Sequence, residues 1–238
     1  MSTIGSECAK RSGPRPGFGA GACYHGRMSS LAGNLRFFRR DRLAVSRAAA
    51  GVLAVAILLT ACSGRDSLYS LKSISGLVPS LEFQLTNQDG QAVTAADYRH
   101  EVVLLYFGYT QCPDECPTTL TMLANALRKL GPRASQVRVL FVSVDPRRDT
   151  TAVLKRYVSN FGPEFVGLRG DPAELAALSK RYRIAYHYEQ PDKYGNYEVD
   201  HSSAIFIFDG RGRARLLGQS DDEAQQVASD LRRLLAST

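Results

Sequence analysis

From residue 80 onward, apolar residues gather into short runs that are separated by polar segments. Two runs, residues 102–107 and 137–144, are almost continuously apolar, which is typical of strands buried on both faces of a sheet. Shorter runs at residues 165–168 and 204–208 predict two further strands. After an Asp-Gly turn, residues 214–217 predict another strand, which forms a hairpin with residues 204–208. The pattern therefore predicts a sheet whose central strands are covered on both faces.

An alternating segment precedes these buried strands. Residues 81–85 alternate between apolar and polar side chains, and residues 87–90 form a turn signal that ends in Asp-Gly. Residues 91–94 can form a second strand that pairs with the first. We expect a β-hairpin at the start of the domain.

Four segments carry apolar residues at helical spacing. The first, residues 118–130, precedes a Gly-Pro stop, and the second begins at an N-cap, either Asp149 or Thr150. The third covers residues 172–182, and a last helix starts at residues 221–223. Strands and helices alternate until a terminal hairpin is followed by the last helix, which predicts an α/β domain that resembles the thioredoxin fold.

Two cysteines follow the first continuous apolar run. Cys112 and Cys116 are separated by three residues, and each is followed by a proline. His201, far downstream, can complete a set of soft ligands, because thiolate sulfur selects Cu(I), zinc or iron–sulfur clusters and imidazole suits copper and zinc. These three residues predict a metal or redox centre.

A structural disulfide is the main alternative for this pair. A bridge across so short a loop would remove little chain entropy, because the stabilisation grows with the length of the closed loop. Cys112 and Cys116 are also the thiols expected to remain in the folded body, since Cys8 and Cys23 lie in an N-terminal segment that we expect to be removed on processing and Cys62, directly after it, is expected to be lipid-modified. A metal or redox function of Cys112 and Cys116 is therefore favoured over a structural disulfide.

The prolines indicate how the pair is held. Pro117 is favoured in the first turn of a helix, and a residue before proline avoids helical angles. We therefore expect a helix that begins at Pro117, with Cys116 at its cap and Cys112 on the preceding loop. A thiolate at a helix N-terminus has a lowered pKa, which favours both nucleophilic attack and metal binding.

The ligand count separates the candidate metals. Two thiolates and one imidazole would give a three-coordinate site, which Cu(I) accepts, whereas structural zinc requires four ligands. Tetrahedral zinc is therefore the weaker interpretation. His100 and His187 are rivals of His201 that we expect in loops, and Asp114 and Glu115 are expected to be solvated turn residues, with attraction of cations as the alternative.

Residues 145–150, Asp-Pro-Arg-Arg-Asp-Thr, leave the second central strand at the same end of the sheet as the cysteines. We expect a turn and a helix cap in this segment. A role in shaping the site or in docking a partner is the alternative.

Positive charge is concentrated before the domain. Residues 1–61 contain nine basic and two acidic residues, whereas residues 62–238 contain 21 of each sign. The formal charge of +7 therefore belongs to the first 61 residues. Because the rest of the chain is neutral, no nucleic-acid partner is predicted.

The N-terminal part resembles an export signal. Residues 36–47 are basic, and residues 48–59 form an apolar stretch that is too short to span a membrane. The stretch ends in Leu-Thr-Ala-Cys62, which resembles a bacterial lipobox, in which the cysteine becomes the lipidated first residue of the mature chain. An uncleaved signal anchor is the alternative.

These features divide the chain into three predicted parts. Residues 1–61 form a leader, whose first 27 residues are consistent with a start-site artefact before Met28. Residues 62–79 form a polar tether from the lipid to the domain, and residues 80–238 form the domain itself.

Three motifs, taken together, resemble those of the Sco/SenC family. They are Phe-Gly-Tyr-Thr-Gln-Cys-Pro-Asp-Glu-Cys-Pro at residues 107–117, Val-Ser-Val-Asp-Pro-Arg-Arg-Asp-Thr at 142–150 and Val-Asp-His-Ser-Ser at 199–203. The resemblance runs from about Gly76 to the C-terminus. It implies a thioredoxin-like fold, with a central mixed sheet flanked by helices, and copper ligands at Cys112, Cys116 and His201.

The family consists of membrane-tethered copper proteins that assist assembly of cytochrome c oxidase. The resemblance implies a metallochaperone that binds Cu(I), with Cu(II) left open. It would deliver copper to the CuA site of oxidase subunit II or to another exported copper protein, or reduce the thiols of that site. A thiol–disulfide oxidoreductase that uses Cys112 and Cys116 as its redox pair is the second hypothesis, and peroxide reduction is a distant third. We expect the domain in the bacterial cell envelope, on the extracytoplasmic side of a membrane that holds it through lipidated Cys62.

Overall fold

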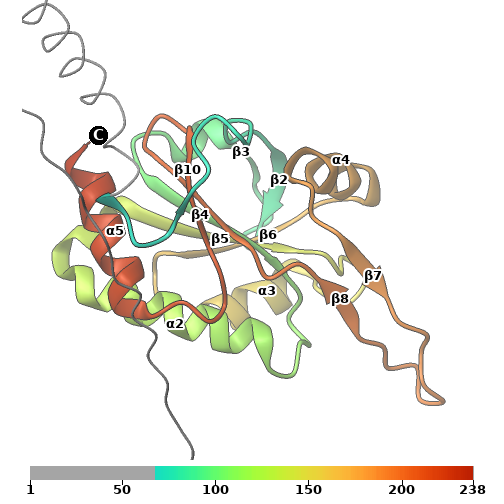
Figure 1. Ribbon diagram of the computed structural model, residues 1–238. Coiled ribbons are helices and arrows are strands. Elements are labelled where there is room, and N and C mark those ends of the chain that lie inside the picture. The colour runs from blue at the N-terminus through green and yellow to red at the C-terminus, as the bar shows by residue number, and fades with distance from the viewer. Residues whose placement is uncertain (1–67, 238) are drawn as a thin grey trace, which may run out of the picture. The chain divides into compact units, whose positions relative to one another are not determined.

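The computed structural model describes residues 68–237 (Figure 1). The predicted leader, residues 1–61, and the lipobox residue Cys62 lie outside the described residues. No helix within residues 68–237 is long and apolar enough to cross a membrane.

The strands and helices alternate along the chain. The strands are β1 Lys72–Ser73, β2 Gln84–Asn87, β3 Ala92–Thr94, β4 Val102–Gly108, β5 Val137–Ser143, β6 Phe165–Arg169, β7 Tyr186–Tyr188, β8 Val199–His201, β9 Ile205–Phe208 and β10 Ala214–Gly218. The α-helices are α2 Glu115–Leu130, α3 Thr151–Val158, α4 Pro172–Tyr182 and α5 Ala224–Ala236, with 3₁₀ turns at η2 Ala95–Tyr98 and η3 Gly131–Gln136.

Eight strands form one mixed sheet in the order β1-β10-β9-β4-β5-β6-β2-β3. Strands β4, β5 and β6 run parallel, and the strands on either side pair antiparallel. This is the thioredoxin-like α/β architecture that the element order predicted, with β2 and β3 as its N-terminal hairpin.

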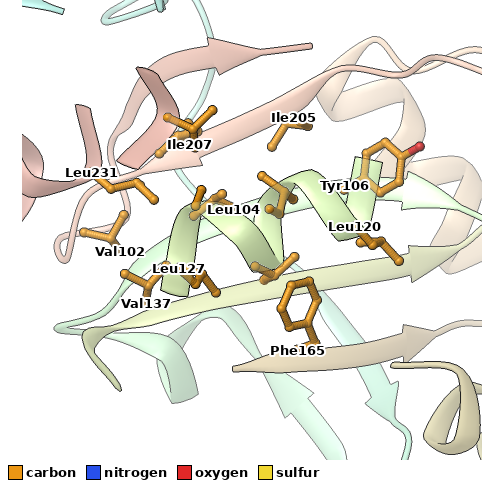
Figure 2. Packing of buried hydrophobic residues seen from close by; sticks show 14 of the residues in the cluster. Val102, Leu104, Tyr106, Leu120, Leu127, Val137, Phe165, Ile205, Ile207 and Leu231 are labelled. Atoms are coloured by element: carbon orange, nitrogen blue, oxygen red, sulfur yellow. The ribbon is translucent and has the colours of Figure 1, made fainter. Parts of the chain in front are cut away.

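Side chains alternate between two cores along β4, because successive residues of a strand point to opposite faces. Val102, Leu104 and Tyr106 belong to a cluster with α2, α3 and α5, whereas Val103 and its alternate neighbours belong to a cluster with α4. Figure 2 shows Leu104 and Tyr106 beside side chains of α2 and β9 in the first cluster. The continuous apolar run of β4 therefore reflects burial on both faces, as predicted.

Two features of the sheet differ from the predictions. The first strand, β1, pairs with β10 and lies inside the stretch predicted as a tether, residues 62–79. Leu71 and Ile74 on either side of β1 are buried, so this part of the stretch packs against the domain. A two-residue strand carries too short a pattern to be recognised in the sequence.

The second difference concerns His201, which lies just before the strand predicted over residues 204–208 and does not join that strand, β9. It ends β8 instead, and β8 pairs only with β7 in a separate two-stranded sheet. Figure 1 shows β7 and β8 extending away from the main sheet, beside the loop that precedes α2.

Candidate metal centre

The cysteine loop connects the C-terminal end of β4 to the N-terminus of α2. Helix α2 begins at Glu115, with Asp114 as its N-cap, and its first backbone hydrogen bond runs from Thr118 N–H to the carbonyl of Asp114. The prediction of a start at Pro117 with Cys116 at the cap is therefore wrong. Pro117 is the third residue of the helix and not the first, and proline is tolerated there because the first four N–H groups of a helix need no partner within it.

Within this loop the two cysteines differ in exposure. Cys112 lies on the loop, as predicted, and is half-buried, whereas Cys116 lies in the first turn of α2 and is fully buried. Both are free thiols. The Cys116 backbone N–H donates to Cys112 Sγ at 3.4 Å, and the hydroxyl of Tyr106, in β4, donates to Cys116 Sγ at 3.7 Å.

His201 reaches the cysteines from the end of β8. Its Nε2 atom lies 3.3 Å from Cys116 Sγ. The imidazole is flanked edge-on by two aromatic rings, with centroid distances of 6.1 Å to Tyr106 and 5.9 Å to Tyr109. The candidate ligand atoms of Cys112, Cys116 and His201 lie within 4.8 Å of one another, which is close enough to hold one metal ion.

The second nitrogen of His201 fixes which tautomer faces the sulfurs. Nδ1 lies 3.1 Å from the carbonyl oxygen of Ser202. A carbonyl oxygen only accepts hydrogen bonds, so Nδ1 carries the proton and Nε2 presents its lone pair to Cys116. This is the arrangement in which histidine binds metals, with the other ring nitrogen donating to an orienting oxygen.

The two thiols have opposite pKa shifts. A hydrogen bond from the Cys116 thiol lowers the pKa of Cys112 to about 4, and backbone N–H groups of Cys116 and Asp114 act in the same direction against partial burial. The pKa of Cys116 is raised, because its proton is held by Cys112 and because it is buried. The reduced pair therefore shares one proton, with the negative charge on the more exposed sulfur.

This asymmetry predicts unusual reactivity for Cys112. Because Cys112 is already a thiolate at pH 6, we expect its rate of alkylation by iodoacetamide to be nearly constant between pH 6 and 8. An ordinary thiol would react about tenfold faster for each pH unit in this range. The rate is measured by mass spectrometry of the Cys112 peptide, and a tenfold rise per unit would contradict the assignment.

Gly108, the last residue of β4, lets the sulfur approach the sheet. A Cβ atom at this position would lie 2.7 Å from Cys116 Sγ and 2.7 Å from the ring of Phe141. Since real Cβ atoms do not approach so closely, only glycine leaves room for Cys116 and Phe141 in their present positions.

Gly108→Ala is therefore expected to displace Cys116 and to destabilise the domain by about 1–3 kcal/mol, the usual cost of overpacking a core. Metal affinity should fall with it. Gly218→Ala is the matched control, because a Cβ atom there meets its neighbours at 3.4 Å or more. Chemical denaturation measures both variants, and equal stabilities would contradict the close approach.

Asp149 anchors the start of the cysteine loop. Its buried carboxylate accepts hydrogen bonds from the Thr110 N–H at 3.0 Å, from the Thr110 hydroxyl at 2.6 Å and from the Ser143 hydroxyl at 2.6 Å. The residue is fully buried and lies just before α3, whose N-cap is Thr150 rather than Asp149. Asp149 thus ties the loop to the end of β5.

The other candidates from the sequence lie elsewhere or stay solvated. His100 precedes β4, at the opposite end of that strand from the cysteine loop, and His187 is exposed on β7. Asp114 and Glu115 are exposed at the start of α2 and are not members of the ligand group. Within residues 68–237, this group of cysteine and histidine ligands has three members, Cys112, Cys116 and His201.

Several residues that shape the site were not singled out individually from the sequence. Tyr106 and Gly108 read as ordinary members of a buried strand, and no sequence signal separates them from their neighbours. Asp149 was named only as a candidate helix cap, and Arg148 only as part of the segment 145–150. A role in shaping the site was the alternative interpretation of this segment, and Asp149 has that role here.

Comparisons with known proteins agree with this geometry. A family model described as SCO1/SenC matches residues 78–236. The mitochondrial protein SCO2 homolog of Bos taurus is 38% identical over 158 residues, which cover 66% of this chain and 59% of that protein. The chain spans 59% to 62% of the length of the first mammalian relatives it matches.

Solved structures show the same relationship. ScoI of Bradyrhizobium japonicum, solved with copper bound, is 42% identical, superposes with a TM-score of 0.61 and is matched over 66% of this chain and 99% of that one. Yeast Sco1 with copper bound is 30% identical, with a TM-score of 0.61 and coverage of 67% and 91%. Because the family model extends over most of the chain and includes the cysteine loop, Asp149 and His201, this chain belongs to the SCO1/SenC family.

Proposed function

We propose that this protein is a copper metallochaperone that holds Cu(I) between Cys112, Cys116 and His201. The observation that carries the proposal is the convergence of two sulfur atoms and the bare Nε2 of an imidazole within 4.8 Å. Two soft thiolates and one imidazole match Cu(I), and residues 68–237 offer this group no fourth histidine, cysteine or carboxylate ligand of the kind that structural zinc requires. The relatives from Bradyrhizobium japonicum and yeast, whose structures contain copper, support the choice of metal.

The exposure of the ligands suits transfer rather than storage. Cys116 is buried at the base of the site, whereas Cys112 and His201 are half-buried and face solvent. An incoming thiolate can therefore attack the ion from the side of Cys112 and replace the protein ligands one at a time. Cu(I) binding also requires the shared proton of the pair to leave, so protonation competes with the metal.

Redox state then acts as a switch on the same pair. Oxidation of Cys112 and Cys116 to a disulfide removes two electrons and the remaining proton, and it consumes both sulfur ligands. The oxidised protein is expected to lose its affinity for Cu(I), because a disulfide offers no thiolate to the metal.

The recipient that we propose is the dinuclear CuA site of cytochrome c oxidase subunit II, as the family resemblance implies. We also propose that the domain is exported and tethered to a membrane through lipidated Cys62. Lipidation is tested by mass spectrometry of protein from membranes: we expect an acylated N-terminal Cys62, and an unmodified chain that retains residues 1–61 would contradict it.

Thiol–disulfide exchange is the second candidate, and the low pKa of Cys112 favours it. The Cys112 thiolate would attack a disulfide of the recipient, releasing one of its sulfurs as a thiolate and forming a mixed disulfide. Cys116, after losing its proton, would then attack Cys112 Sγ and release the second sulfur. Two electrons pass from the pair to the recipient, which leaves reduced, and the chaperone retains the Cys112–Cys116 disulfide.

One experiment separates these functions. The chaperone is loaded with one Cu(I) and mixed with the apo form of a subunit II copper domain whose cysteines are reduced. We expect copper to pass to the domain, measured by mass spectrometry of both proteins. If copper stays with the chaperone, but the copper-free reduced chaperone reduces the disulfide of the oxidised domain, the oxidoreductase function replaces the chaperone function.

A further inference from the structure

The loop after β5 joins the two halves of the candidate copper site. Helix α2 and its loop carry the cysteines, whereas the hairpin over residues 186–201, hereafter the histidine hairpin, carries His201. We infer that Arg148 is a positioning residue that clamps the histidine hairpin onto the cysteine loop. This inference rests on the proposed function, since it assigns a role at the same site.

The histidine hairpin needs such a clamp because it is not part of the main sheet. Strands β7 and β8 pair only with each other, over three residues each. An isolated two-stranded hairpin is at best marginally stable in water, so its position depends on contacts with the rest of the domain. Its middle portion, residues 189–196, is exposed, which places those contacts near its base.

Arg148 makes contacts in both directions. The central carbon of its guanidinium lies over the ring of Tyr197, 3.6 Å from the ring centroid, and Nη1 donates to the Tyr197 carbonyl at 2.9 Å. The same nitrogen donates to Gln111 Oε1 at 3.2 Å, next to Cys112. One side chain thus holds the histidine hairpin on one side and the cysteine loop on the other.

Asp145 fixes Arg148 in this position. Its carboxylate is fully buried and forms an ion pair with the Arg148 guanidinium. The other carboxylate oxygen accepts a hydrogen bond from the Tyr197 hydroxyl at 2.9 Å. Asp145, Arg148 and Tyr197 therefore form a closed set of contacts, in which the tyrosine is held through its ring, its hydroxyl and its backbone.

A further tyrosine extends the attachment. The hydroxyl of Tyr188, in β7, donates to the Val144 carbonyl at 2.6 Å, and its ring packs edge-on against Tyr197 at 5.9 Å. The histidine hairpin is thereby fixed, through β7 and through the residue Tyr197 before β8, to the segment that follows β5. His201 lies four residues after Tyr197, so a shift of this tyrosine moves the imidazole relative to the sulfurs.

The consequence is that copper affinity depends on Arg148 although it does not contact the metal ligands. In Arg148→Gln the guanidinium bridge is lost, so the histidine hairpin should loosen and His201 should contribute less. Loss of a residue that orients a metal ligand typically lowers metal affinity by about 10–100-fold. Arg147→Gln is the matched control, because Arg147 is adjacent, carries the same charge and is exposed.

The first test needs no copper. Hydrogen exchange is measured on the full chain in detergent micelles, with Cys8→Ser, Cys23→Ser and Cys62→Ser so that the site holds the remaining thiols. In Arg148→Gln we expect faster exchange of the Glu189 N–H, which donates to the Glu198 carbonyl across the hairpin. Equal exchange in Arg148→Gln and the Arg147→Gln control would overturn the inference.

The second test measures coupling between Arg148 and His201. Cu(I) affinity is determined for the same chain, for Arg148→Gln, for His201→Ala and for the double variant. If Arg148 acts through His201, Arg148→Gln costs about tenfold or more alone and much less when His201 is already absent. Equal losses in both backgrounds would overturn the inference. Failure of the unsubstituted site to bind Cu(I) would instead refute the proposed function, and hydrogen exchange would still decide the clamp.

Two more variants keep the test decisive. Arg148→Gln leaves the buried Asp145 carboxylate without its ion-pair partner, and this unpaired charge can unfold the protein. In that case the double variant Asp145→Asn with Arg148→Gln is used, because it removes both charges together. Arg148→Lys keeps the positive charge but removes the guanidinium that lies over the Tyr197 ring and donates to both Tyr197 and Gln111. We therefore expect the histidine hairpin to be as loose in Arg148→Lys as in Arg148→Gln. Full recovery of hairpin protection in Arg148→Lys would overturn the role of the stacked bridge.

Discussion

Cys116→Ser is expected to abolish tight Cu(I) binding. The substitution removes a buried sulfur that lies 3.3 Å from His201 Nε2 and forms the base of the site. It also removes the thiol that hydrogen-bonds to Cys112 and lowers the pKa of that residue. The affinity loss should therefore exceed the roughly 10–100-fold cost of removing a residue that merely orients a metal ligand.

Competition with a Cu(I) chelator measures this loss, and Cys112→Ser provides the comparison. Cys112→Ser also removes one thiolate, but it leaves the buried thiol and His201 in place. Both variants should bind Cu(I) far more weakly than the protein with both cysteines. Retention of full affinity in Cys116→Ser would show that the buried sulfur is not a ligand, and the site would then have to be sought around Cys112 alone.

Asp149→Ala is expected to have the largest effect on folding among the substitutions around the site. It leaves two Thr110 donors and the Ser143 hydroxyl without their acceptor in a buried region. Unsatisfied buried polar groups cost about 1–3 kcal/mol each, with partial relief from water, so we expect a loss of about 3 kcal/mol in the free energy of unfolding. The cysteine loop should also lose its anchor, so Cu(I) affinity should fall.

Asp171→Ala is the control for this prediction. Asp171 is also an aspartate at the start of a helix, but its side chain caps α4 through a capping box with Glu174. Loss of an N-cap costs about 1 kcal/mol, and Cu(I) affinity should not change. Denaturant unfolding and Cu(I) titration of both variants test the contrast. Equal effects of Asp149→Ala and Asp171→Ala would show that Asp149 is an ordinary helix cap.

The main sheet and its helices could be predicted because their patterns are long. Strand β4 and helix α2 carry seven and sixteen residues of consistent burial or periodicity; β4 lies where expected, and α2 differs from the prediction only at its start. Short elements behave differently. Strands β7 and β8 have three residues each and mixed burial, so their pairing depends on tertiary contacts that no local pattern records.

The three candidate ligands could be proposed from residue types and family motifs, but their geometry could not. The start of α2 was misplaced by two residues because proline in the first turn allows several starting points. The tautomer of His201 depends on the Ser202 carbonyl, and the room for Cys116 depends on Gly108. These are relationships between neighbouring elements, and they appear only once the chain is folded.

The most direct test of the proposed copper site is a Cu(I) titration of the full chain with and without His201. The reduced protein, carrying Cys8→Ser, Cys23→Ser and Cys62→Ser, is titrated against a competing chelator beside the same chain with His201→Ala. We predict tight binding of one Cu(I) per chain and a loss of about tenfold or more in the variant, equivalent to about 1.4 kcal/mol or more. Weak binding, or binding that does not depend on His201, would contradict the two-sulfur, one-nitrogen copper site and leave thiol–disulfide exchange as the function of the cysteine pair.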